Sequence, residues 1–158
     1  MPTSHALQRT PHGAELSRWG VAGFLFGAVS VLVFHQAVVA LFHVLGLTAA
    51  QPYSLQSTSP WGIPQVLSLA FWGGIWGIVL AMSLARLAGP RLLLAATAFG
   101  AILPTLVAWF VVAPLKHQPA AGGLVASAMA LALIANGLWG LGTGIGLALF
   151  GRQRGGHD

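Results

Sequence analysis

The scarcity of charge along four long apolar segments is the feature that most constrains this chain. Its 158 residues include 7 Lys or Arg and 2 Asp or Glu, while 56% of the residues are hydrophobic. A soluble domain usually carries charge on about a quarter of its residues, so this chain has too few charged side chains to cover a water-facing surface. We therefore expect an all-α fold, an integral membrane four-helix bundle with lipid as its main solvent.

The apolar segments define the expected domain organisation. They extend over residues 20–47, 63–87, 92–112 and 124–150, and each is long enough to cross a hydrocarbon core of about 30 Å. We expect residues 18–151 to form the four-helix membrane domain. Residues 1–17 are predicted to be a flexible cytoplasmic tail and residues 152–158 a short cytoplasmic stub.

The basic residues predict the orientation of the spans. Four spans place both termini on one side, and every basic residue except Lys116 then shares that side: Arg9, Arg18, Arg86, Arg91, Arg152 and Arg154. Because cytoplasmic loops carry an excess of Lys and Arg, both termini are predicted to be cytoplasmic. The same single, dispersed charges argue against a nucleic-acid partner, which would need a basic patch.

Two short matches suggest a duplicated helical hairpin. Residues 26–28 (FGA) in the first segment match residues 99–101 (FGA) in the third, and residues 74–77 (GIWG) in the second match residues 137–140 (GLWG) in the fourth. Since the matches occur in the same order, the hairpins would be parallel repeats related by an axis along the membrane normal. Chance similarity between Gly- and Ala-rich segments is the alternative explanation.

Glycines one helical turn apart predict close packing between helices. Gly73 and Gly77 form one such pair, and Gly137, Gly140 and Gly144 form a strip along the fourth helix. Small residues at this spacing let helix backbones approach closely in lipid. Packing within one monomer is the simpler interpretation, and contact with a second copy or another membrane-complex subunit is the alternative.

Four polar residues form a candidate polar site at the membrane midplane. His35, Gln36, Thr105 and Asn136 lie near the middle of their expected spans. Polar groups in hydrocarbon are costly unless paired, so we expect them to face the bundle interior and one another. Hydrogen bonding between helices would account for them, and a site for a proton, an ion or a small polar solute is the alternative.

Catalytic and cofactor chemistry finds little support in the sequence. The acids Glu15 and Asp158 both lie outside the apolar segments, and the chain has no Cys. His35 and His43 are eight residues apart on one expected helix, so they cannot hold one iron from opposite faces. We predict a protein that is not an enzyme, with no catalytic residue, no metal and no cofactor.

Three stretches carry a resemblance to known proteins. Residues 34–36 (FHQ), 61–65 (WGIPQ) and 68–77 (SLAFWGGIWG) resemble a group of small four-helix inner-membrane proteins of proteobacteria that has no established activity. The resemblance implies a bacterial inner-membrane location and assigns no functional residue.

The sequence leaves three functional hypotheses, in order of preference. The first is a non-enzymatic membrane subunit or scaffold packed through its Gly-rich helix faces. The second is a small oligomeric permease or channel that uses the midplane polar site. The third is a haem or quinone redox subunit.

Overall fold

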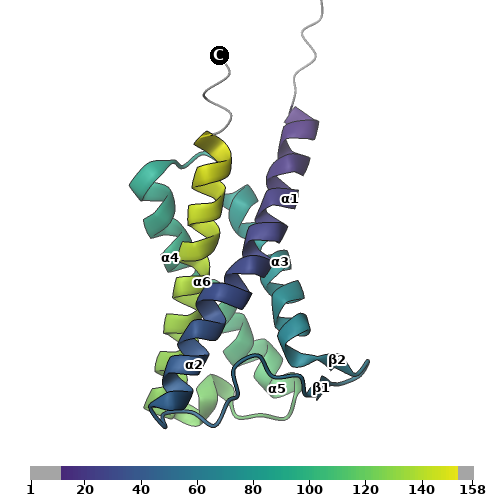
Figure 1. Ribbon diagram of the computed structural model, residues 1–158, viewed down its shortest axis with the longest axis vertical. Helices are drawn as coiled ribbons and strands as arrows, with labels where there is room; N and C mark the ends of the chain where they lie inside the picture. Colours follow the sequence, from purple (N-terminus) through teal and green to yellow (C-terminus); the bar gives the residue numbers. More distant parts are fainter. Residues whose placement is uncertain (1–11, 153–158) are drawn as a thin grey trace, which may run out of the picture.

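Four long helices run side by side in the computed structural model, which describes residues 12–152 (Figure 1). The first span consists of α1 (His12–Ser30), the π-helical segment η1 (Val31–His35) and α2 (Gln36–Val44), and the second is α3 (Gln65–Ser83). The third consists of α4 (Gly89–Val107), the π-helical segment η2 (Ala108–Val112) and α5 (Ala113–Leu115), and the fourth is α6 (Ala126–Arg152). All four are long and apolar enough to cross a membrane, which confirms the all-α prediction at this level.

Helix ends near the termini and in the second span differ from the expected bounds. α1 begins at His12, inside the segment predicted as a flexible tail. The rest of that tail (1–11) and residues 153–158 of the predicted stub lie outside the described residues. α3 ends at Ser83, four residues before the predicted end, because the chain turns there toward its short connection with α4.

The third span is longer than expected. It extends from Gly89 to Leu115 rather than over 92–112. Pro90 occupies the first turn, where its missing N–H is not needed. Pro104 lies inside the helix, and the π-helical segment η2 follows four residues later. The helix therefore continues past the proline, as transmembrane helices often do where neighbouring groups and local π-helical adjustments satisfy the backbone.

The first and third spans end in the same kind of cap. Gly46 and His117 both adopt the left-handed conformation, with φ of 68° and 53°. The N–H of the next residue, Leu47 or Gln118, donates to the carbonyl five residues earlier, at 2.9 Å and 2.8 Å. This geometry is a Schellman motif, which satisfies carbonyls at a helix end.

The connections at this end of the bundle contain short elements that the sequence did not suggest. β1 (Ser57–Thr58) pairs antiparallel with β2 (Ile63–Pro64) in the connection between the first two spans. The connection between the last two spans contains η3 (Ala120–Leu124), a single short turn with left-handed backbone at its centre.

Glycines bring the helices of each hairpin into backbone contact. A Cβ on Gly27 of α1 would collide with the backbone of Gly73 and Gly77 of α3. In the second hairpin a Cβ on Gly100 of α4 would collide with the backbone of Asn136 and Gly140 of α6. The matched segments align Gly27 with Gly100, Gly77 with Gly140 and Gly73 with Asn136, so both hairpins cross at equivalent positions.

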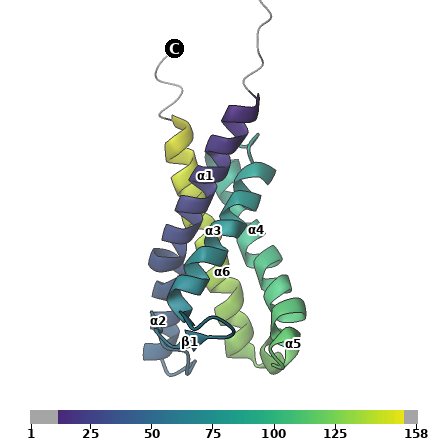
Figure 2. The same ribbon diagram turned by 90° about the vertical axis from the view of Figure 1, so that its right-hand side faces the viewer.

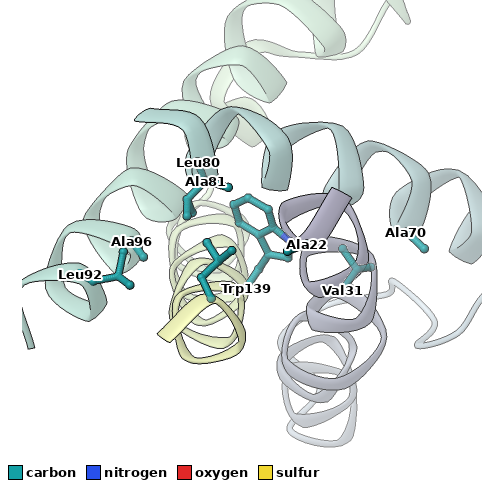
Figure 3. Close-up of a cluster of buried hydrophobic side chains, with 9 residues drawn as sticks. Ala22, Val31, Ala70, Leu80, Ala81, Leu92, Ala96 and Trp139 are labelled. Atoms are coloured by element: carbon teal, nitrogen blue, oxygen red, sulfur yellow. The ribbon is translucent and has the colours of Figure 1, made fainter. Parts of the chain in front are cut away.

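The two hairpins join through α1 and α6, while α3 and α4 barely meet. α1 packs against α3 and α6, and the first and third spans do not pack against each other. α3 and α4 touch through Trp76 and Phe99, whose ring centroids are 6.1 Å apart. They then diverge toward the end of the bundle that contains α5 and the β1–β2 pair (Figure 2). The buried core therefore centres on Trp139 of α6, with Leu80 and Ala22 nearby (Figure 3).

Candidate functional site

The observed helix limits shift the middle of the first span toward its N-terminus. The apolar helix covers Ser17–Val44, so its midpoint lies at Ser30 and Val31, about one turn before His35. In the fourth span, Ala126–Gly151, the midpoint lies at Trp139. The four residues of the predicted midplane site therefore lie between the middle of the bundle and the end that contains connections 45–64 and 116–125.

Gln36 binds the first connection rather than another helix. Its side chain is buried, and its Oε1 accepts a hydrogen bond of 2.7 Å from the backbone N–H of Tyr53. Since α2 ends at Val44, the connection must fold back along the helix by about two turns to reach Gln36. Gln36 thus acts as an anchor for this connection.

The same tyrosine satisfies a carbonyl in the π-helical segment η1. The hydroxyl of Tyr53 donates to the carbonyl of Leu32 at 2.8 Å. π-Helical turns disturb the regular helix ladder and are frequent at functional sites. Tyr53 itself has φ of 52°, which is uncommon for a residue with a Cβ. Its two hydrogen bonds hold it in this conformation.

Thr105 and Asn136 form a pair within the second hairpin. The Asn136 Nδ2 donates to Thr105 Oγ1 at 2.9 Å, and Thr105 is fully buried. The Thr105 hydroxyl in turn donates to the carbonyl of Ala132 at 3.5 Å, which is long for an O–H donor. The pair links α4 to α6 in the direct way expected of polar side chains in lipid.

His35 differs from the other three residues of the predicted site. Its Nδ1 is buried and has no hydrogen-bond partner. The same holds for the Nδ1 of His43, eight residues further along the first span in α2. Buried polar atoms are nearly always paired, so each of these two needs an explanation.

The structure does not connect the four residues into one group. Gln36 and the Thr105–Asn136 pair are linked to different partners, and no hydrogen bond within residues 17–151 joins them. His35 and Gln36 lie on the first span and Thr105 on the third, and these spans do not pack against each other. The sequence could not show this because the order of the helices around the bundle depends on tertiary packing.

A second polar network, which the sequence analysis missed, lies at the middle of the bundle. The Trp139 indole N–H donates to the carbonyl of Gly27 at 2.9 Å, and the Ser30 hydroxyl donates to the carbonyl of Trp139 at 2.6 Å. The Thr143 hydroxyl donates to that same carbonyl at 2.9 Å. All three polar side chains are buried. The Trp139 and Ser30 hydrogen bonds join the two hairpins, and the Thr143 hydrogen bond lies within α6. Their only sequence signal is the position of two hydroxyls and one indole at mid-span.

The predicted packing glycines lie at helix contacts of differing closeness. Gly73 and Gly77 face α1, and a Cβ on Gly140 would collide with the backbone of Ala96 in α4. Gly144 lies against the Ala96 side chain, while a Cβ on Gly137 would make an ordinary contact of 3.5 Å with Ala101.

Two further glycines of α6 contact the first span. A Cβ on Gly142 would overlap Phe34 and Ser30, and one on Gly146 would overlap Phe26. α6 therefore uses two different glycine faces, one toward α4 and one toward α1.

Metal-ligand clustering does not support a metal site at His35. Among the described residues, no group of three or more His, Cys, Asp or Glu side chains is close enough to hold a metal ion. One cavity lies along α1 near Arg18, and another lies under the first connection beside Gln51, Gln56 and Gln65.

Comparison with known proteins returns no relative. No family model matches this chain, and neither does any curated protein or solved structure.

Proposed function

We propose that this chain is an integral protein of the bacterial inner membrane, crossing it four times with both termini in the cytoplasm, and that it serves as a non-enzymatic subunit or scaffold. Four long apolar helices support the insertion. The start of α1 (with Arg18), the α3–α4 connection (with Arg86) and the start of α4 (with Arg91) lie at the end of the bundle where α6 ends (Figure 1). The connection after α5, which contains Lys116, lies at the other end, which supports the orientation.

The observation that carries the scaffold proposal is the buried network around Trp139. Two of its hydrogen bonds, from Trp139 to the Gly27 carbonyl and from Ser30 to the Trp139 carbonyl, connect one hairpin to the other. Side chains that hold helices together in this way serve the structure of the bundle rather than a reaction. Contacts with a partner would then use surfaces other than the glycine faces, which the chain occupies itself.

His35 separates the scaffold from the second candidate, a permease or channel. The unpartnered, buried Nδ1 of His35 at the end of η1 favours this alternative, because ionisable residues inside a membrane often mark pathways. We reconstitute the protein or its His35→Leu variant into vesicles loaded with a panel of small solutes. We expect both kinds of vesicle to release these solutes no faster than vesicles without protein do. Flux that varies with pH near the titration range of imidazole and disappears in His35→Leu would overturn the scaffold proposal.

We further propose that the hairpins arose by duplication of one unit. Trp76 of the first hairpin contacts Phe99 of the second, and the aligned Trp139 of the second donates to Gly27, which follows the aligned Phe26. Both hairpins also carry a π-helical segment in their first helix. The aligned residues Trp76 and Trp139 thus each contact the other hairpin beside a matched Phe-Gly-Ala segment, although α1 packs on α6 more extensively than α3 packs on α4.

A further inference from the structure

A groove of about 330 Å³ runs along α1 at the end of the bundle where α1 begins and α6 ends. Arg18 lies at its polar end beside Ser17, and the remaining lining is apolar: Val21, Ala22, Leu25, Phe26 and Phe150. We infer that this groove binds an anionic phospholipid, with the phosphate at Arg18 and one acyl chain along the apolar residues. The inference rests on the proposed membrane location.

The positions along α1 match the order of groups in a phospholipid. The apolar helix begins at Ser17, so Arg18 lies at the level expected for lipid headgroups. Leu25 follows two turns later on the same side of the groove, about 10 Å deeper. A lipid that places its phosphate at Arg18 therefore brings its acyl chain onto the apolar lining without bending.

The far wall of the groove is held in place by aromatic packing. The Phe150 ring meets the rings of Trp19 and Phe26 edge to face, with centroids 5.8 Å and 6.5 Å away. Phe26 in turn fits against Gly146, where a Cβ would overlap its ring. Because the wall belongs to the packing of α1 on α6, the groove is formed before a ligand arrives, which lowers the cost of binding.

Charge selects the class of headgroup. Arg18 is exposed, and residues 16–157 contain no Asp or Glu to neutralise it. Glu15 precedes it by one turn, and its side chain lies outside the described part of the chain. A guanidinium binds phosphate oxygens in a bidentate manner. The described lining of the groove contains no acid to pair with the amine of a zwitterionic lipid, so a headgroup with net negative charge fits this lining better than phosphatidylethanolamine.

The test compares lipid binding by the purified full-length protein and matched variants. Native mass spectrometry would follow titration with phosphatidylglycerol, phosphatidylethanolamine and phosphatidylcholine. We expect the wild type to bind phosphatidylglycerol more tightly than the other two lipids. In Arg18→Gln this preference should fall about tenfold, which corresponds to about 1.4 kcal/mol of binding free energy from one charge-assisted contact. Arg91→Gln removes the same charge at the same end of the bundle, outside the groove lining, and should keep the preference.

A second variant tests the apolar part of the groove. Val21 lines the groove and is 61% exposed, so Val21→Trp should fill the groove without disturbing the core. It should weaken binding of all three lipids. Inorganic phosphate in large excess should not displace the bound lipid, because it lacks an acyl chain.

Three results would overturn the inference. Arg18→Gln could keep the wild-type preference, Arg91→Gln could lose as much of it, or inorganic phosphate or oleate could compete as well as the phospholipid does. A chain that does not stay with bilayers after a carbonate wash would instead overturn the proposed membrane function. The two failures are therefore distinguishable.

Discussion

Trp139 is the residue on which the joining of the two hairpins depends most directly. The residue is 2% exposed, and its indole N–H donates to the carbonyl of Gly27. Trp139→Phe keeps most of the apolar ring and removes the donor. Hydrogen bonds between helices in membranes contribute about 0.6–2 kcal/mol, so we expect a loss of unfolding free energy in this range, measured by steric trapping in bicelles.

Trp76 provides the matched control for this prediction. It occupies the aligned position in the first hairpin, it is only partly buried, and its indole makes no hydrogen bond to the described residues. Trp76→Phe should therefore cost clearly less than Trp139→Phe. Equal losses would show that ring size, rather than the hydrogen bond to Gly27, explains the effect.

Tyr53 allows a separate test of the contact between the first connection and the helix. Gln36→Leu would leave the Tyr53 N–H without its acceptor, while Tyr53→Phe would remove only the bond to the Leu32 carbonyl. We expect faster amide hydrogen exchange across residues 48–60 in both variants, with the larger effect in Gln36→Leu. Unchanged exchange in both would contradict the role assigned to Gln36.

At the scale of elements, the glycine contacts give a sharp prediction within a single helix. Gly23 and Gly20 both lie on α1, but a Cβ on Gly23 would collide with the backbone of Gly77, and one on Gly20 would meet only Ile78 at 3.8 Å. Gly23→Ala should force α1 and α3 apart and cost about 1–3 kcal/mol, as overpacking does. Gly20→Ala should be neutral or stabilising because alanine favours the helix.

The second hairpin repeats this test with another pair of residues. Gly140 meets the backbone of Ala96 closely, while Gly137 has an ordinary contact with Ala101. We expect Gly140→Ala to lower stability and Gly137→Ala to leave it nearly unchanged, as measured by thermal denaturation in detergent. A larger cost at Gly137 would contradict the crossing point that the structure gives to α4 and α6.

The helices were predictable from the sequence because their signal is local. Long apolar segments with charge at their ends indicate helices that can span a bilayer, whatever their neighbours are. Helix ends were less predictable, since the stop of α2 at Val44 depends on the Schellman motif at Gly46. The continuation of α4 through Pro104 depends on the neighbouring backbone, which a sequence does not display.

The polar site was the least predictable feature because it depends on the order of the helices in the bundle. Depth along each helix suggested that Thr105 and Asn136 would lie near each other, and the Asn136 Nδ2 donates to Thr105 Oγ1. It also suggested that Gln36 would join them, but the third span packs on α6 and not on the first span. Gln36 instead binds a connection that folds back by two turns, a long-range contact with no periodic signal.

For the whole molecule, we propose that the chain crosses the membrane four times with both termini in the cytoplasm. The sequence contains no Cys, so single cysteines can be introduced without removing others. Ser59 and Gln118 are exposed in the two connections at one end of the bundle, and Ala88 is exposed in the connection at the other end.

Labelling of these single-cysteine variants in spheroplasts with a membrane-impermeant maleimide is the most direct test. We expect Ser59→Cys and Gln118→Cys to react in intact spheroplasts, and Ala88→Cys to react only after lysis. Reaction of Ala88→Cys from outside, or reaction of only one of the other two, would contradict the four-span topology with cytoplasmic termini.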